Sequence, residues 1–501
     1  MDKQFSRKNH FKFINVCNLV IILISVNQLA TPYLPTGQSA RWSPPQTIPL
    51  YDPQTWPPIL VADQNRTVHA LSSQWISDDN GEALRVIFYN RWTLEQGWTI
   101  PNDIIISPSK EARITDAYLD SNDMLHVVFW GGDNTKADIY YSKASAAIAD
   151  DSRSWSIPLV VGEDAGDPEG AVFAENKQGD LLLIYHGKLY GNGLYVKKSQ
   201  DGGDTWSSPD PIFLTNVTAP LIRDIHVIKG SNGWLNLVWD VINTGGQGRG
   251  IYYARTQNGE EWSEPVLLAS AEEGYGTQTP AIIEHDGVIF VFFAGISMRQ
   301  SLDNGVTWSN SVRIFPRYEG VNGSLSPVID GNGVLHLFFG QRIPNPEIHG
   351  MWHSVWINNR WTEPEAIIKG PSVNDPVGNK SFDPFEARAV VSQGNVILVT
   401  WRTDPGVKGN GVWYSYQILD APELPIKPLR TQLAQAINLP PTPVPTVFNQ
   451  EKMSPDHQAE FNKQPPSIGY NSNFAIAMGV IPALLIVLSI VLIKLARDKS
   501  L

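Results

Sequence analysis

Trp262-Ser263-Glu264-Pro265 is one of seven copies of a short motif, in which Trp is followed by Ser or Thr and usually by Pro two or three residues later. The copies are spaced by 46 to 57 residues. They begin at Trp42, Trp98, Trp155, Trp206, Trp262, Trp308 and Trp361. Self-similarity at such a period is typical of repeat architectures, in which each repeat is one supersecondary unit that buries its faces against its neighbours.

Each interval has the same layout of apolar segments, which predicts four short strands. A strand and a Gly/Asn/Asp turn precede a strongly apolar strand, as in Asp120-Ser-Asn-Asp-Met-Leu-His-Val-Val-Phe-Trp130, and this pattern indicates a β-hairpin. A four-stranded unit of about 50 residues exposes both faces unless it stacks radially, and stacking leaves only short edges. The pattern therefore predicts an all-β propeller from about residue 41 to 420.

Counting the repeats favours seven blades, with six as the alternative. Seven three-strand bodies can be recognised, the last at about 385–419, but only six are followed by their own Trp strand. The segment at 42–48 carries the same motif, so we expect it to complete the last blade and close the ring. Closure of this kind is noncovalent.

Two segments identify a family resemblance. Ser199-Gln-Asp201-Gly-Gly203-Asp-Thr-Trp206 and Ser301-Leu-Asp303-Asn-Gly305-Val-Thr-Trp308 match Ser-x-Asp-x-Gly-x-x-Trp, and Gln257-Asn-Gly259-Glu-Glu-Trp262 is a partial copy. The chain thus resembles the sialidase-like (neuraminidase superfamily) propellers with Asp-box, or BNR, repeats. Asp and Ser in such a box form local hydrogen bonds in a turn between the third and fourth strands. The box is scaffold, so we expect the chemistry on the opposite rim.

The two ends of the chain predict membrane association. Residues 1–30 combine basic residues with an apolar stretch, as in a signal peptide or, alternatively, an N-terminal anchor. Residues 421–473 are Pro-rich and polar, which favours an extended stalk. Residues 474–493 carry no charge and are long enough to span a bilayer, and the basic tail at 494–501 should remain cytoplasmic. We therefore expect a single-pass protein of the cell membrane, with the propeller outside the cytoplasm.

Composition excludes several classes of function. The net charge of −12 argues against a nucleic-acid partner, because phosphate binding requires clustered Lys and Arg. The only cysteine, Cys17, lies in the N-terminal segment, so the predicted propeller has neither a disulfide nor a thiol nucleophile. Ten scattered His residues form no spaced ligand set. No metal or cofactor is expected, and the sequence makes no prediction of oligomeric state.

The resemblance implies a set of catalytic residues. Sialidase-like enzymes hold a substrate carboxylate with three arginines, and the planar guanidinium suits this because it donates two parallel hydrogen bonds. Arg113 in Ala112-Arg-Ile-Thr115 matches part of the family's Arg-Ile-Pro sequence, with Thr115 in place of Pro. The further first-strand arginines are Arg223 in Leu221-Ile-Arg-Asp224 and Arg388 in Phe385-Glu-Ala-Arg388. Asp133 follows the second strand of the second repeat and is the candidate general acid. No residue is assigned as the nucleophile.

Further residues are expected to bind substrate. Aligning the repeats gives five charged residues the same strand parity, so their side chains should leave on one side. These residues are Asp116, Glu169, Arg223, Glu386 and Arg388. Alternatively, they pair with one another around a polar axis. Trp130, Trp239 and Trp401 end second strands, where they either stack on sugars or fill space between blades.

Two functions remain open from the sequence. The first is a stalked exo-glycosidase of the sialidase superfamily that removes a terminal acidic sugar from a glycan. The alternative is a noncatalytic propeller that binds glycans or proteins and keeps its box motifs for folding only.

Overall fold

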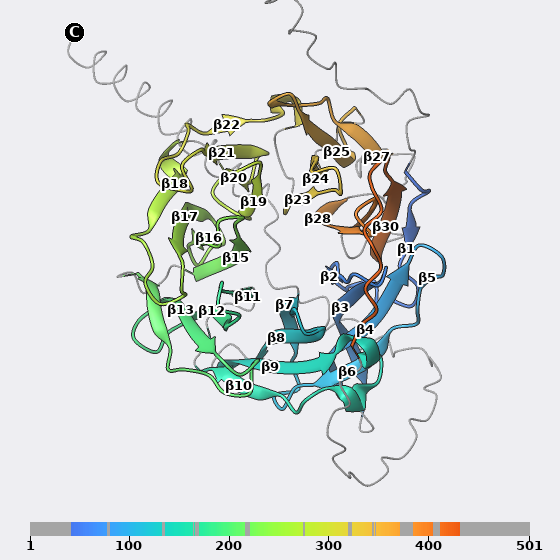
Figure 1. The fold of residues 1–501 in the computed structure, drawn as a ribbon, viewed down its shortest axis with the longest axis vertical. Helices are drawn as coiled ribbons and strands as arrows, with labels where there is room; N and C mark the ends of the chain where they lie inside the picture. Colours follow the sequence, from blue (N-terminus) through green and yellow to red (C-terminus); the bar gives the residue numbers. More distant parts are fainter. Residues whose placement is uncertain are drawn as a thin grey trace, which may run out of the picture. The chain divides into compact units, whose positions relative to one another are not determined.

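Seven antiparallel sheets stand around a common axis in the computed structural model of the chain (Figure 1). The structure describes residues 42–77, 81–132, 136–163, 165, 170–215, 221–273, 276–318, 323–342, 345, 347–370, 384–403 and 411–430. Nearly all of them belong to one unit, residues 1–243 and 248–432. This unit confirms the predicted seven-bladed propeller, and the six-bladed alternative is wrong.

Each blade places its first strand at the axis and adds the others outward. The first strands are β2 (Ile59–Ala62), β7 (Arg113–Leu119), β11 (Ala171–Glu175), β15 (Leu221–Lys229), β19 (Ala281–His285), β23 (Ser326–Ile329) and β28 (Phe385–Ser392). The second strands are β3 (Val68–Ser77), β8 (Met124–Gly132), β12 (Leu181–Gly187), β16 (Leu235–Ile242), β20 (Val288–Phe293), β24 (Leu335–Gln341) and β29 (Val396–Thr403). The third strands are β4 (Ala83–Thr93), β9 (Ala137–Ser145), β13 (Gly193–Ser199), β17 (Gly248–Thr256), β21 (Ser297–Ser301), β25 (Gly350–Ile357) and β30 (Gly411–Ile418).

The outer strands are short and vary between blades. They are β5 (Gly97–Trp98) with β6 (Asn102–Ile106), β10 (Leu159–Gly162), β14 (Asp210–Leu214), β18 (Val266–Ser270), β22 (Val312–Arg313), β26 (Arg360–Trp361) with β27 (Glu365–Lys369), and β1 (Gln46–Thr47). Four single-turn 3-10 helices lie in connections: η1 (Ala146–Ile148), η2 (Ser152–Ser154), η3 (Ala271–Glu273) and η4 (Pro316–Tyr318).

The N-terminal segment closes the ring, as the sequence predicted. Strand β1 pairs with β30, and the sheet order of the last blade is β1-β30-β29-β28. Ser43 strengthens the closure, because its main chain donates to the carbonyl of Tyr416 and its carbonyl accepts from the Ser415 hydroxyl at 2.7 Å. Pairing the first and last segments removes an exposed strand edge from the blade.

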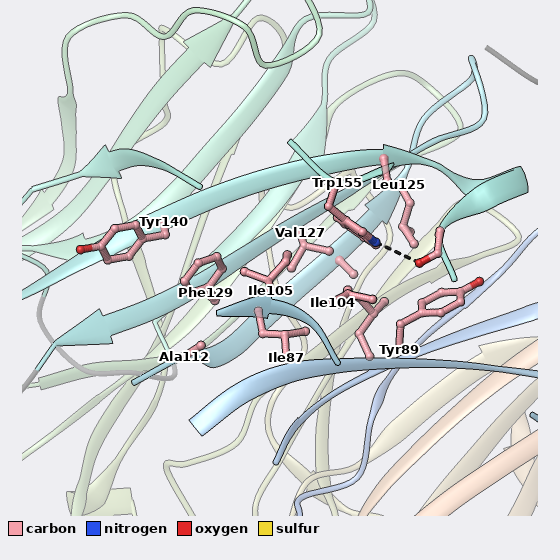
Figure 2. Packing of buried hydrophobic residues seen from close by; sticks show 14 of the residues in the cluster. Ile87, Tyr89, Ile104, Ile105, Ala112, Leu125, Val127, Phe129, Tyr140 and Trp155 are labelled. Atoms are coloured by element: carbon pink, nitrogen blue, oxygen red, sulfur yellow. Dashed lines mark hydrogen bonds between the residues drawn. The ribbon is translucent and has the colours of Figure 1, made fainter. Parts of the chain in front are cut away.

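Seven hydrophobic clusters form the core, one between each pair of neighbouring blades. Each cluster contains one Trp of the repeated motif, packed against the preceding blade. Figure 2 shows the cluster between the first and second blades, where Trp155 packs near Leu125 and donates to the carbonyl of Ala149 at 2.9 Å. The Trp motif thus recurs because every interface between blades needs the same large side chain to fill it.

The two Ser-x-Asp-x-Gly-x-x-Trp segments form matching turns between third and fourth strands. In the first, Asp201 accepts from the Ser199 hydroxyl and from the amide and hydroxyl of Thr205, at 2.6 to 2.9 Å. Asp303 accepts the equivalent three bonds in the second. These hydrogen bonds lower the pKa of Asp303 to about 2. The charged carboxylates therefore stabilise the turns by accepting their hydrogen bonds. We call the rim that carries these turns, together with the first turns at Asp63, Asp120 and Asp330, the hairpin rim.

The propeller extends beyond the expected boundary at residue 420. Residues 421–430 cross the hairpin rim, where the amide of Leu424 donates to Gln393 in the last blade at 2.7 Å. The amide of Lys427 donates to Gln64 in the first blade at 2.9 Å, and that of Arg430 to the Asp123 carboxylate at 3.1 Å. The start of the expected stalk is thus bound to the propeller.

Several predicted segments lie outside the described residues: 1–30, the stalk from 431 to 473, the span at 474–493 and the tail at 494–501. Among the residues that are described, no helix is long and apolar enough to cross a membrane.

Candidate functional site

Three of the first strands that surround the axis carry β-bulges near the rim where they begin. The register shifts between Ile114 and Asp116 in β7, between Arg223 and His226 in β15, and between Phe385 and Arg388 in β28. Bulges redirect side chains and are frequent beside functional sites. Simple alternation therefore does not hold across these three bulges, because each inserts an extra residue; Glu169, one of the five charged residues expected on one side, lies outside the described residues.

Two bulges hold an acidic residue in a left-handed conformation. Asp224 has a φ of 42° and Glu386 has a φ of 56°. Residues other than glycine rarely adopt this region of backbone conformation. The Ser324 hydroxyl donates to the Glu386 carboxylate at 2.7 Å and helps to hold it. His226 and Arg388 follow these two residues at equivalent positions, opposite Val238 and Thr400. The strained residues thus directly precede the segments that carry His226 and Arg388. We call the region around Asp116, His226 and Arg388, near the starts of these first strands, the channel mouth.

The charge of Arg388, on the seventh blade, acts on two groups of other blades. These groups are Asp116 of the second blade and His226 of the fourth. Burial raises the pKa of Asp116 to about 6, while amide hydrogen bonds and the charge of Arg388 oppose the rise. One of those bonds comes from the Phe173 amide at 2.8 Å. His226 is reachable by water, yet the surrounding protein lowers its pKa, and Arg388 lowers it further. At neutral pH the channel therefore offers a guanidinium, a neutral imidazole and a carboxyl group that is partly protonated.

Arg113 lies at the same rim but is paired with a carboxylate. Its Nε atom is 2.6 Å from Glu111 Oε1, and the same oxygen is 2.7 Å from Nη1 of Arg85. Burial lowers the pKa of Arg85 to about 10, and the charge of Glu111 opposes this. Arg85 therefore remains charged at neutral pH, and Glu111 is shared between the two guanidinium groups.

Arg223 stands directly opposite Asp240 in the pairing of β15 with β16. Asp240 is fully buried and accepts from the Thr279 amide at 3.3 Å. Thr279 itself has a φ of 49°, so a third strained residue lies at this rim.

Guanidinium–aromatic stacks recur around the rim. Arg85 lies 4.4 Å from the ring centre of Trp75, and Arg113 lies 5.3 Å from that of Trp130. Further around the ring, Arg342 stacks on Phe385 and Arg402 on Trp56. We call this surface the arginine rim, defined by Trp56, Trp75, Arg85, Arg113, Trp130, Arg342, Phe385 and Arg402.

The structure places the predicted site residues in three groups. Asp116 and Arg388 lie within electrostatic reach of each other in the channel, whereas Arg113 and Arg223 face carboxylates. Trp130, Trp239 and Trp401 pack in the cores between blades, which is the alternative the sequence left open for them. Asp133 and Glu169 lie outside the described residues.

Sequence reasoning missed Glu111 and His226. His226 had a recognisable signal, because Asp224-Ile-His226 repeats the order acidic, apolar, basic of Glu386-Ala-Arg388. Glu111-Ala-Arg113 repeats the same order, but nothing in the sequence pointed to the contact of Glu111 with Arg85 of another blade. Within the described part of the chain, no group of three His, Cys, Asp or Glu side chains could hold a metal ion.

The fold defines the chain as a seven-bladed β-propeller with charged residues on first strands around its axis. No protein-family profile matches the sequence, and no curated protein is similar to it.

Solved structures with a similar arrangement of strands include enzymes of varied activity. An ulvan lyase, a polysaccharide lyase bound to a GlcA–Rha3S saccharide, is 14% identical with a TM-score of 0.47, covering 75% of this chain and 97% of the lyase. A leech intramolecular trans-sialidase is 12% identical with a TM-score of 0.40, covering 74% and 68%. An α-L-arabinofuranosidase from Fusarium graminearum is 11% identical with a TM-score of 0.39, covering 60% and 92%. Similarity of this degree does not indicate an activity for this chain.

Proposed function

We propose that the chain is a glycan-active propeller that takes an acidic sugar at the channel mouth. The observation that carries this proposal is the convergence of Arg388, His226 and Asp116 from three different blades. Arg388 would bind the acidic group of the sugar, because a guanidinium donates two parallel hydrogen bonds to a carboxylate. His226, neutral at physiological pH, would both donate and accept hydrogen bonds with hydroxyl groups.

Asp116 would supply the proton for cleavage of a glycosidic bond. A carboxyl group with a pKa of about 6 is protonated often enough near neutral pH to act as a general acid, yet becomes a stable anion after it donates. The acid that the family resemblance suggests, Asp133, directly follows the last residue of β8 in the sequence and is the competing donor. The reaction we propose is hydrolysis at a terminal acidic sugar.

A second function is favoured by the pairing of Glu111. Because Glu111 contacts both Arg85 and Arg113, two arginines of this rim are already partly neutralised. This suits a noncatalytic propeller that binds a glycan through the remaining charge and its aromatic surface.

One experiment separates the two functions. The full-length protein is incubated between pH 4 and 8 with fluorogenic sialosides, glucuronides and neutral glycosides, and its binding to the same sugars is measured by calorimetry. Arg388→Lys tests the channel, and Arg255→Gln is the matched control, since Arg255 stacks on Trp234 at 4.5 Å on the hairpin rim. Turnover that Arg388→Lys abolishes supports the enzyme, and binding without turnover supports the binder. If the protein neither turns over nor binds any acidic sugar, both proposed functions are refuted.

We also propose that the segment at 474–493 anchors the propeller to a membrane. The last described residue, Arg430, contacts Asp123 on the hairpin rim, the rim opposite the channel mouth. Carbonate extraction of cell membranes tests the anchor: the full chain should remain in the pellet, and a chain ending at residue 473 should not.

A further inference from the structure

Two arginines share one aromatic ring at the blade 6 and blade 7 section of the arginine rim. The Cζ atom of Arg342 lies 4.3 Å from the ring centre of Phe385, and that of Arg402 lies 5.1 Å from it. Arg342 follows β24, whereas Phe385 begins β28 and Arg402 lies in β29. Two positive charges are thus held close together by the packing of neighbouring blades.

The fourth member of this cluster is Trp56, on the connection from β1 to β2. Its ring centre is 4.2 Å from Cζ of Arg402 and 6.3 Å from the ring centre of Phe385, with the two rings at 74°. Trp56 is 50% exposed, whereas Phe385 and Arg402 are 8% and 6% exposed. A large aromatic side chain therefore stands half in solvent beside two stacked guanidinium groups.

Backbone packing fixes this arrangement. At Gly340, a Cβ atom would lie 2.3 Å from the carbonyl oxygen of Pro384, so β24 and the start of β28 approach as closely as only glycine allows. Arg342, Phe385 and Arg402 are consequently held at strand ends, and rigid placement lowers the entropic cost of ligand binding.

The chemistry of the cluster suits an anionic sugar. A guanidinium that stacks on a ring uses its face, and the N–H groups that bind carboxylate or sulfate lie in its plane. The face of Trp56 can stack on the apolar side of a sugar ring, as aromatic side chains with one apolar face and one wet edge do at binding surfaces. Phe385 and Arg388 are three residues apart on β28, so the cluster is within about 10 Å of the channel mouth.

We propose that Trp56, Arg342, Phe385 and Arg402 form a subsite for a second anionic sugar, and that the ligand of this propeller is a polyanionic oligosaccharide rather than a single acidic sugar. This inference rests on the proposed function of the channel mouth and extends it. The first acidic sugar lies at Arg388, and the next charged sugar of the same chain reaches the Arg342–Arg402 pair.

Calorimetry on the full-length protein tests the subsite. The probes are galacturonic acid, trigalacturonate, a chondroitin sulfate tetrasaccharide and neutral cellotriose, so that carboxylate and sulfate are compared directly. The test variants are Arg342→Gln and Trp56→Ala, because both side chains reach the surface. Arg255→Gln serves as the control stack on the other rim, and the melting temperature of each variant reports whether it folds.

We expect Arg342→Gln and Trp56→Ala each to weaken binding of trigalacturonate or the chondroitin tetrasaccharide by about 10-fold, because the first removes a charge-assisted hydrogen bond and the second an aromatic stacking surface. Binding of galacturonic acid should change by less than about twofold in the same folded variants, since it uses Arg388. Arg388→Lys should weaken both ligands.

Equal affinity of the folded Arg342→Gln variant and the wild type for both charged oligosaccharides would overturn the subsite and leave the channel proposal standing. Equal affinity of the wild type for galacturonic acid and trigalacturonate would do the same. Absence of binding to every acidic probe would overturn the proposed function, and the subsite with it.

Discussion

Replacing Asp116 by Asn removes the titrating group of the channel while keeping an oxygen that accepts the Phe173 amide. Burial raises the pKa of Asp116 from 3.8 to about 6, so the folded state binds this proton more tightly than the unfolded state. Its contribution to stability is fully present below about pH 4 and is lost as the pH rises through 6. A shift of about two pKa units corresponds to about 3 kcal/mol, and water at the channel mouth reduces this to roughly 1–3 kcal/mol.

The assay is urea unfolding of the wild type and the Asp116→Asn variant between pH 4 and 8, followed by tryptophan fluorescence. Other titrating groups occur in both proteins, so their contributions largely cancel in the difference between the two free energies of unfolding. We expect that difference to shift in favour of the variant by about 1–3 kcal/mol between pH 4 and 7. A difference that stays constant over this range would refute the raised pKa and remove Asp116 as the proton donor.

Other predictions test the frame of the propeller. Gly305→Ala places a Cβ atom against the Tyr253 hydroxyl at a φ of 80°, whereas Gly287 has a similar φ of 76° and open space. We expect Gly305→Ala to cost about 1–3 kcal/mol more than Gly287→Ala in urea unfolding, and equal losses would contradict the clash. Deleting residues 42–48 removes β1 and the Trp42 packing. Differential scanning calorimetry should show a lower melting temperature, and an unchanged one would contradict ring closure. Truncation after residue 420 should speed amide exchange at the first turns of blades 1 and 7, which residues 421–430 cover, and unchanged exchange there would contradict that contact.

The blade count could be predicted from the sequence because it depends on a local signal that repeats. Every blade interface needs one large side chain in the same place, so the seven Trp residues mark the seven interfaces. The sequence pattern alone also predicted ring closure, because the last repeat lacks its own outer strand and the motif at Trp42 precedes the first repeat. The same method failed at residues 421–430, because their composition predicts an extended chain but not the surface that it contacts.

The site could be predicted only in part, because it depends on where different blades meet. Asp116 and Arg388 were recognised as charged residues on first strands, but the bulges that orient His226 and Arg388 depend on backbone angles at Asp224 and Glu386. The pairing of Glu111 with Arg85 and Arg113 joins two blades across a contact that no spacing encodes. Trp239 and Trp401 lie near the ends of second strands, where the sequence does not distinguish an exposed aromatic residue from a buried one, and packing between blades buries both.

A structure of the protein with bound trigalacturonate tests most directly whether the channel mouth recognises acidic sugars. We expect one carboxylate of the ligand at Arg388, with His226 and Asp116 facing the same sugar, and a second carboxylate toward Arg342. A ligand held on the hairpin rim or on the outer strands, with the channel residues untouched, would contradict the proposed site.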